Sequence, residues 1–123
     1  MAQQALVLFA HGARSPAWAG PFERLREMTA ARLPACTVSL AFLELMTPSL
    51  ADEVATLAAN GVRQVTVVPV FLGQGGHLQR DLPALAARLR EQHPGLRLAV
   101  AGPVGEDPGV LAAMAEYCIG ALG

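Results

Sequence analysis

Two kinds of segment alternate along this chain: short continuous apolar runs, and longer stretches in which apolar residues recur at helical spacing. The apolar runs cover residues 6–10, 38–43, 65–72 and 96–101. Runs of this length, bounded by polar or glycine-rich turns, are typical of strands that are buried on both faces of a sheet. Because helical stretches separate the four runs, the pattern predicts consecutive parallel βαβ units.

The helical stretches are recognised by apolar residues three or four positions apart. The predicted apolar faces are Phe22, Leu25, Met28 and Leu33; then Leu50, Val54 and Leu57; then Leu78, Leu82, Leu85 and Leu89; and finally Leu111, Met114, Cys118 and Leu122. Thr47 and Asp107 each precede a proline, which predicts a helix cap followed by proline at the first helical position. The third helix is expected to begin a few residues after His77.

These elements predict the α/β class, with one doubly wound, four-stranded parallel sheet and helices on both faces. The chain has 123 residues, which lies within the usual range of one domain. Residues 1–123 are therefore expected to form a single domain with one core.

Three residues that can bind a metal ion or carry a proton follow the first three apolar runs. His11, Glu44 and His77 are separated by 33 positions and then by 33 again. In open α/β sheets the carboxyl ends of the strands meet at one edge, and ligands bind there. Imidazole and carboxylate groups both coordinate divalent transition metals. The pattern therefore predicts a metal-handling enzyme with these three side chains at one edge of the sheet.

Each candidate also has an ordinary structural explanation. A histidine after a strand is commonly a packing residue, and Glu44 fits a surface carboxylate at a strand end. Its apolar neighbours in 42–46 instead favour a sheltered carboxylate suited to proton transfer. Arg14, Arg80 and Asp81 stand beside the histidine loops, where they either bind acidic groups or pair with one another.

Composition excludes several other classes. The formal net charge is -1, so nucleic acid is not expected as a partner. Residues 73–76 contain three glycines but form neither a dinucleotide-binding fingerprint nor a phosphate-binding P-loop. The first apolar run is too short for a signal peptide or a membrane span. The two cysteines are too few and too far apart to form a zinc knuckle. We therefore expect a cytoplasmic protein with no membrane partner.

The residues after the first three strands resemble those of the small class II tetrapyrrole metal chelatases, and in particular the short sirohydrochlorin cobaltochelatases. The resemblance is found in 10–15, 41–48 and 68–83, and it extends over nearly the whole chain. Its most specific part is the segment 68–77, which reads VPVFLGQGGH.

This resemblance implies that the chain inserts a divalent metal ion, with cobalt favoured, into sirohydrochlorin during cobalamin biosynthesis. His11 and His77 match the paired histidines of the family and would bind the metal and accept pyrrole protons, with Glu44 assisting. The residues expected to contact the carboxylates of the substrate are Arg14, Gln74, Gly75, Gly76 and Arg80. The resemblance further implies a homodimer and no organic cofactor, since the metal is itself a substrate.

Three alternatives remain open on the sequence alone. Iron or nickel would suit the same ligands as cobalt, because imidazole and carboxylate donors do not select among these ions. A non-catalytic metal carrier would use the same three residues without any chemistry. A histidine-dependent phosphatase also has a His-Gly pair after its first strand, but such enzymes have arginine immediately before the histidine, where this chain has Ala10.

Overall fold

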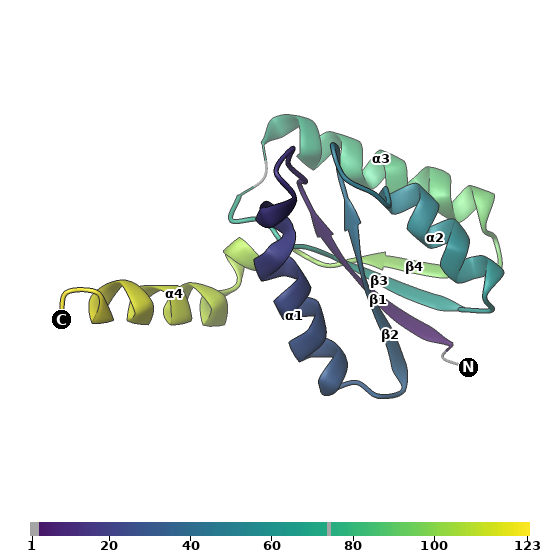
Figure 1. The fold of residues 1–123 in the computed structure, drawn as a ribbon. Coiled ribbons are helices and arrows are strands. Elements are labelled where there is room, and N and C mark those ends of the chain that lie inside the picture. Colours follow the sequence, from purple (N-terminus) through teal and green to yellow (C-terminus); the bar gives the residue numbers. More distant parts are fainter. Residues whose placement is uncertain (1–2, 74) are drawn as a thin grey trace.

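The computed structural model describes residues 3–73 and 75–123, and the side chain of His77 lies outside the described part. Its sheet consists of the parallel strands β1 (Gln4–Ala10), β2 (Cys36–Phe42), β3 (Gln64–Pro69) and β4 (Arg97–Val100). The strand order is β2-β1-β3-β4, so β1 lies between β2 and β3 (Figure 1). The predicted α/β class and the four-stranded parallel sheet are confirmed.

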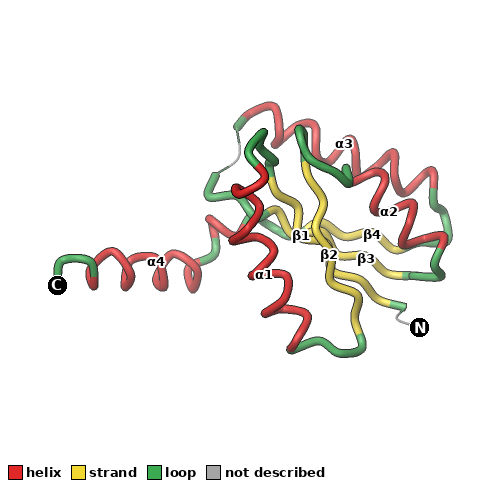
Figure 2. Tube along the Cα trace, viewed as in Figure 1, coloured by secondary structure: helices red, strands yellow, loops and turns green. Residues whose placement is uncertain are grey.

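The helices differ in how they meet this sheet. They are α1 (Gly20–Ala31), α2 (Leu50–Ala59), α3 (Gly76–Gln92) and α4 (Pro108–Gly120), with short 3-10 turns η1 (Pro16–Ala19) and η2 (Val104–Glu106). Helices α2 and α3 lie on one face of the sheet and α1 lies on the other (Figure 2). Helix α4 leaves the body of the molecule and ends at the C-terminus.

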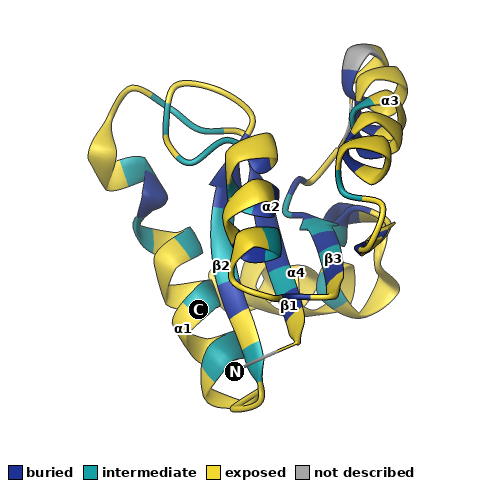
Figure 3. Cartoon of the chain, turned by 90° about the vertical axis from the view of Figure 1, so that its right-hand side faces the viewer, coloured by how far each residue is buried: buried dark blue, intermediate teal, exposed yellow. Residues whose placement is uncertain are grey.

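The main core lies between the sheet and the pair α2 and α3. Alternate residues along the strands point to this side, among them Val7, Val65 and Val67, each with no exposed surface. They meet Val54 of α2 and Leu89 of α3, which are also buried. Period-two alternation on the strands and helical spacing on the helices thus close one face of the sheet (Figure 3).

The face covered by α1 has a smaller core. Ala10, Ala19 and Phe42 are buried there, and Trp18 and Phe22 pack against them. The other apolar residues predicted for this helix do not all reach the core, which corrects the sequence analysis: Leu25 is 38% exposed, Met28 is 68% exposed and Leu33 is 39% exposed.

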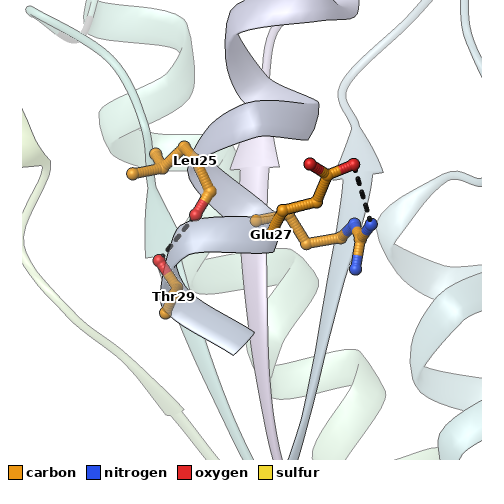
Figure 4. A network of polar contacts seen from close by, with 4 residues as sticks. Leu25, Glu27 and Thr29 are labelled. Carbon is orange, nitrogen blue, oxygen red and sulfur yellow. Dashed lines mark hydrogen bonds and ion pairs between the residues drawn. The ribbon is translucent and has the colours of Figure 1, made fainter. Parts of the chain in front are cut away.

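Two polar contacts of α1 are local. The hydroxyl of Thr29 donates to the carbonyl oxygen of Leu25 at 2.7 Å, and Arg26 pairs with Glu27 at 3.9 Å (Figure 4). Both contacts lie within the helix itself, so they do not attach it more firmly to the sheet. Phe22 attaches the helix to the sheet, because it packs against the buried residues of this smaller core.

The helix starts confirm one predicted cap and correct another. Asp107 caps α4, because its carboxylate accepts a hydrogen bond from the amide of Val110 at 3.1 Å. Thr47 does not cap α2: the cap is Ser49, whose hydroxyl accepts from the amide of Asp52 at 3.1 Å. Within the described residues, no helix combines the length and apolar character needed to cross a membrane.

Candidate functional site

The loops after β1 and β2 are joined directly through their backbones. Beyond the last paired residues of the two strands, the amide of Leu43 donates to the carbonyl of Ala10 at 2.8 Å. The amide of Glu44 then donates to the carbonyl of His11 at 3.0 Å. Two of the three predicted site residues are therefore neighbours at the carboxyl edge of the sheet.

Gly12 permits this close contact. Its φ is +94°, a left-handed conformation that L side chains rarely adopt. A Cβ atom at this position would lie 1.9 Å from the carbonyl oxygen of Glu44. The His-Gly pair therefore has a structural reason: only glycine allows the loop of His11 to pass against the loop of Glu44.

Phe71, in the loop after β3, supports His11. The two rings are 4.3 Å apart between centroids and tilted by 38°, and Phe71 also packs against Phe9 at 5.8 Å. Phe71 is only 3% exposed, whereas His11 is exposed. A buried aromatic ring behind the imidazole limits the orientations that the imidazole can adopt.

The apolar run 65–72 predicts a strand that includes Phe71 and Leu72, and this prediction is wrong. Strand β3 ends at Pro69, and the two residues belong to the loop that follows. Proline has no backbone N–H to donate to a neighbouring strand, and this signal in the sequence marks the end of the pairing. The short turn η2 holds Phe71 in place, because the amide of Gly105 donates to the carbonyl of Phe71 at 2.9 Å.

The third predicted residue lies at the beginning of α3. The helix begins at Gly76, so His77 belongs to its first turn, and the prediction that the helix starts a few residues later was wrong. Gln74 and the side chain of His77 lie outside the described part. Among the side chains that the structure does describe, no group of three His, Cys, Asp or Glu residues could hold a metal ion. Joint coordination by the three residues stays a prediction.

The surroundings of Glu44 differ from the prediction. Leu43, Glu44 and Leu45 are all exposed, so the carboxylate is not sheltered by its apolar neighbours. Leu45 has a φ of 65°, which turns the chain sharply after Glu44. The carboxylate is therefore open to solvent and to any ligand at this edge.

Arg14 and Arg80, the basic residues near the edge, form no ion pair with any carboxylate that the structure describes. Among the described residues, the ion pair within 4 Å is that of α1, so Arg14, Arg80 and Asp81 do not pair with one another. Arg14 is exposed in the loop after His11. Arg80 is exposed on α3 and donates through Nε to the carbonyl of Gly76 at 3.3 Å. Pairing of these charges with one another is therefore not observed. Binding of acidic groups by the two arginines stays a prediction.

A hollow lies beside this edge, between α3 and the ends of β1 and β2. It has a volume of about 200 Å³, and its lining combines apolar residues such as Leu43 and Leu78 with the charged residues Asp81 and Arg88. Sites that enclose a small organic molecule usually have volumes of roughly 300 to 1,000 Å³. His11, Glu44, Arg14 and Arg80 are not among the described residues that line it, so the hollow lies beside these candidate residues and is not formed by them.

Comparison with known proteins gives concordant matches. A family model described as CbiX matches residues 5–119. A sirohydrochlorin cobaltochelatase of Methanopyrus kandleri is 37% identical over 81 residues, which are 66% of this chain and 57% of that protein. A sirohydrochlorin ferrochelatase of Bacillus subtilis is 25% identical over 119 residues, which are 91% of this chain and 43% of that protein. The chain thus spans less than two thirds of the length of these relatives.

The solved structures agree with the sequence matches. The crystal structure of a CbiX protein from Marinobacter aquaeolei matches with a TM-score of 0.86 and 35% identity. The match covers 97% of both chains, so the fold described above recurs over almost its whole length in that protein.

Proposed function

Because the chain belongs to the CbiX family, we propose that it is a sirohydrochlorin chelatase that inserts a divalent metal ion, with cobalt favoured, into sirohydrochlorin. The observation that carries the proposal is the match of the family model to residues 5–119. The relatives support it, since they are a cobaltochelatase and a ferrochelatase acting on the same tetrapyrrole. The metal ion is a substrate in this reaction, and we propose no organic cofactor.

We assign the chemistry to His11, Glu44 and His77. Insertion requires the metal to lose bound water and two pyrrole N–H protons to leave the ring. An exposed imidazole at His11, oriented by a buried ring, suits temporary metal binding and proton acceptance. An exposed carboxylate at Glu44 suits proton acceptance or a third metal contact. Weak, open coordination is what a site needs if it must release its metal.

We assign substrate carboxylates to the start of α3 and to the nearby arginines. No acidic residue occupies the first turn of α3, and Gly75 and Gly76 leave open space where a side chain would stand. Free amides at a helix start attract anions, and an unpaired guanidinium binds carboxylates with two parallel hydrogen bonds. Arg14 and Arg80 are therefore proposed as carboxylate contacts, and Gln74 remains a sequence-based candidate.

We propose that residues 1–123 act as one domain in a homodimer. The exposed positions of His11, Glu44 and Arg14 support this, because a second copy facing this edge would cover a ligand that one chain leaves open to solvent. The net charge of -1 gives no reason to add a nucleic acid partner. A cytoplasmic location stays a prediction from the sequence.

The experiment that tests the activity follows the absorbance of sirohydrochlorin under anaerobic conditions. Purified protein is mixed with cobalt, nickel or ferrous ion at low concentration, each against a control without protein. We expect the spectral shift of metal insertion to be faster with protein, and fastest with cobalt. Tight metal binding with no acceleration for any metal would identify a carrier instead. Acceleration with iron or nickel alone would retain the chelatase and replace the metal.

Matched histidine variants test the assigned residues. We expect His11→Ala and His77→Ala to lower turnover by about 10²- to 10⁴-fold, the usual range for a lost proton acceptor, with little change in the thermal midpoint. His93→Ala is the control, because His93 follows the other end of α3. Equal turnover for all three variants would contradict the assignment. For Glu44→Gln we expect a fall in turnover that exceeds the loss of substrate affinity.

A further inference from the structure

Helix α4 has the composition of a buried helix and the position of an exposed one. Between Pro108 and Gly120 the only charged residue is Glu116. Even so, Tyr117 is 80% exposed and Ile119 is 62% exposed, and Leu122 just beyond the helix is 89% exposed. The main contact of α4 is with η2, and the helix projects away from the sheet (Figure 1). A helix that is apolar on all sides is normally buried.

The same chain has an apolar surface without a cover. On the face of the sheet that holds α1, that helix packs on β2 and β1 and leaves β3 and β4 open. We define the open strip as four residues on this face: Thr66 and Val68 of β3, Ala99 of β4 and, beside them at the start of β1, Leu6. Ala99 is exposed and the other three are half-buried, whereas their sequence neighbours Val65, Val67 and Leu98 on the opposite face are fully packed.

Helix α4 and the open strip fit each other in length and in charge. A helix of 13 residues is about 20 Å long, and a strand the length of β3 also spans about 20 Å. Exposed Arg97 begins β4 and shares the face of Ala99, so it can meet Glu116, the single acid of the helix. The helix does not reach the strip of its own chain, because it leaves η2 in the outward direction.

We propose that two copies of this chain exchange their α4 helices, each helix covering the open strip of the other copy. Exchange is reciprocal and closes after two copies, as a two-fold contact must. It involves two helices and two strips, which favours the roughly 1,200 Å² or more of total buried surface found in stable interfaces. The inference rests on the homodimer proposed above and supplies its contact, but it does not depend on the chelatase chemistry.

The exchange also reaches the candidate site. Helix α4 begins directly after η2, whose Gly105 amide holds the carbonyl of Phe71. Phe71 in turn stacks against His11. Exchange therefore attaches the second copy through the segment that follows η2, next to the loop that supports His11.

The first test measures molar mass in solution by light scattering after size-exclusion chromatography. We expect two copies for the unchanged chain and a twofold lower mass for the double variant Tyr117→Glu, Ile119→Glu. Both positions are exposed in the single chain, so the variant should keep its fold, which circular dichroism checks. The double variant Ala84→Glu, Ala87→Glu on α3 is the matched control and should retain two copies, because it adds the same two charges at exposed positions on the other face.

Two results of this test would overturn the exchange. One is a single copy for the unchanged chain, which would also remove the proposed homodimer. The other is an unchanged mass for the α4 variant, which would leave a dimer that uses another face. Met28→Glu identifies that face if the exposed side of α1 forms the contact. The absorbance assay on the unchanged chain is separate, so a failed exchange and a failed chelatase remain distinguishable.

The second test locates α4. In a Cys36→Ser background, Ala99→Cys provides a thiol on the open strip, and exposed Cys118 provides one on α4. Equal amounts of ¹⁴N- and ¹⁵N-labelled chains are unfolded, refolded together and treated with a thiol cross-linker. We expect linked peptides from positions 99 and 118 that combine the two isotopes. Links within one isotope only would mean that α4 folds back on its own sheet, and an absence of links between these positions would equally contradict the exchange.

Discussion

The two faces of the sheet contrast in how completely the chain covers them. Toward α2 and α3, Val7, Val65 and Val67 have no exposed surface. Toward α1, only the part next to β2 and β1 is closed, and residues of equal hydrophobicity in α4 stay exposed. An apolar segment therefore indicates burial somewhere in the assembly, and it does not say against which chain.

At the carboxyl edge of the sheet, the backbone of the loops is fixed whereas several side chains are exposed. The loops of His11 and Glu44 are fixed by backbone hydrogen bonds, by Gly12 and by the ring of Phe71. The side chains proposed to contact the substrate, including Arg14, are exposed. A rigid backbone with open side chains is a suitable arrangement for a site that receives a metal and releases it.

The largest expected effect separates two adjacent residues of the loop after β3. We expect Phe71→Ala to lower the free energy of unfolding by about 3–5 kcal/mol, because a large buried ring is lost. Leu72→Ala, at a residue that is 65% exposed, should change it by no more than about 0.5 kcal/mol. Urea unfolding measures both. Equal costs would mean that the loop is packed differently from the structure described.

The contrast between the two faces is tested by a pair of leucines. Leu89→Ala removes a side chain that is 1% exposed in the main core and should cost about 2–5 kcal/mol at any protein concentration. Leu122→Ala should cost less than about 0.5 kcal/mol in dilute protein. If the helices are exchanged, its cost rises with concentration, because association stabilises the folded state. If the cost of Leu89→Ala also rose with protein concentration, the main core and α4 would not differ in their dependence on association.

A pair of glycines tests the joined loops. Gly12→Ala should destabilise the fold by about 1–3 kcal/mol, because a side chain there is strained at φ +94° and would collide with Glu44. It should also lower the turnover of sirohydrochlorin by displacing His11. Gly102→Ala is the control, since nothing lies within 4 Å of its added Cβ. Thermal unfolding and the absorbance assay, applied to both variants, give the comparison; an unaffected Gly12→Ala protein would contradict the close contact.

The smallest effect concerns the two helix caps, which form hydrogen bonds of equal length. Ser49→Ala should lower the free energy of unfolding by about 1 kcal/mol, because α2 is part of the main core. Asp107→Ala should reduce the helical signal of α4 and leave the unfolding midpoint of dilute protein unchanged. Circular dichroism reports both quantities. A matching shift in the midpoint for Asp107→Ala would show that α4 unfolds together with the core.

The periodic patterns predicted the sheet well because period-two strands and helical stretches are local properties. They were less accurate at boundaries, where contacts between distant segments decide. Pro69 ends the pairing of β3, and α3 starts at Gly76 rather than beyond His77. The sequence also suggested a sheltered Glu44, but apolar neighbours in sequence did not become neighbours in space.

The sequence by itself determined the order in which strands and helices follow one another along the chain. It also determined that His11 and Glu44 follow strands whose carboxyl ends meet at one edge of the sheet. Only the tertiary structure revealed that Gly12 admits the loop of Glu44 and that Phe71 supports His11. It alone also separated the covered apolar faces from α4 and the open strip. The physical reason is that hydrophobicity specifies that a surface avoids water, while the geometry of the folded chain decides which surface it meets.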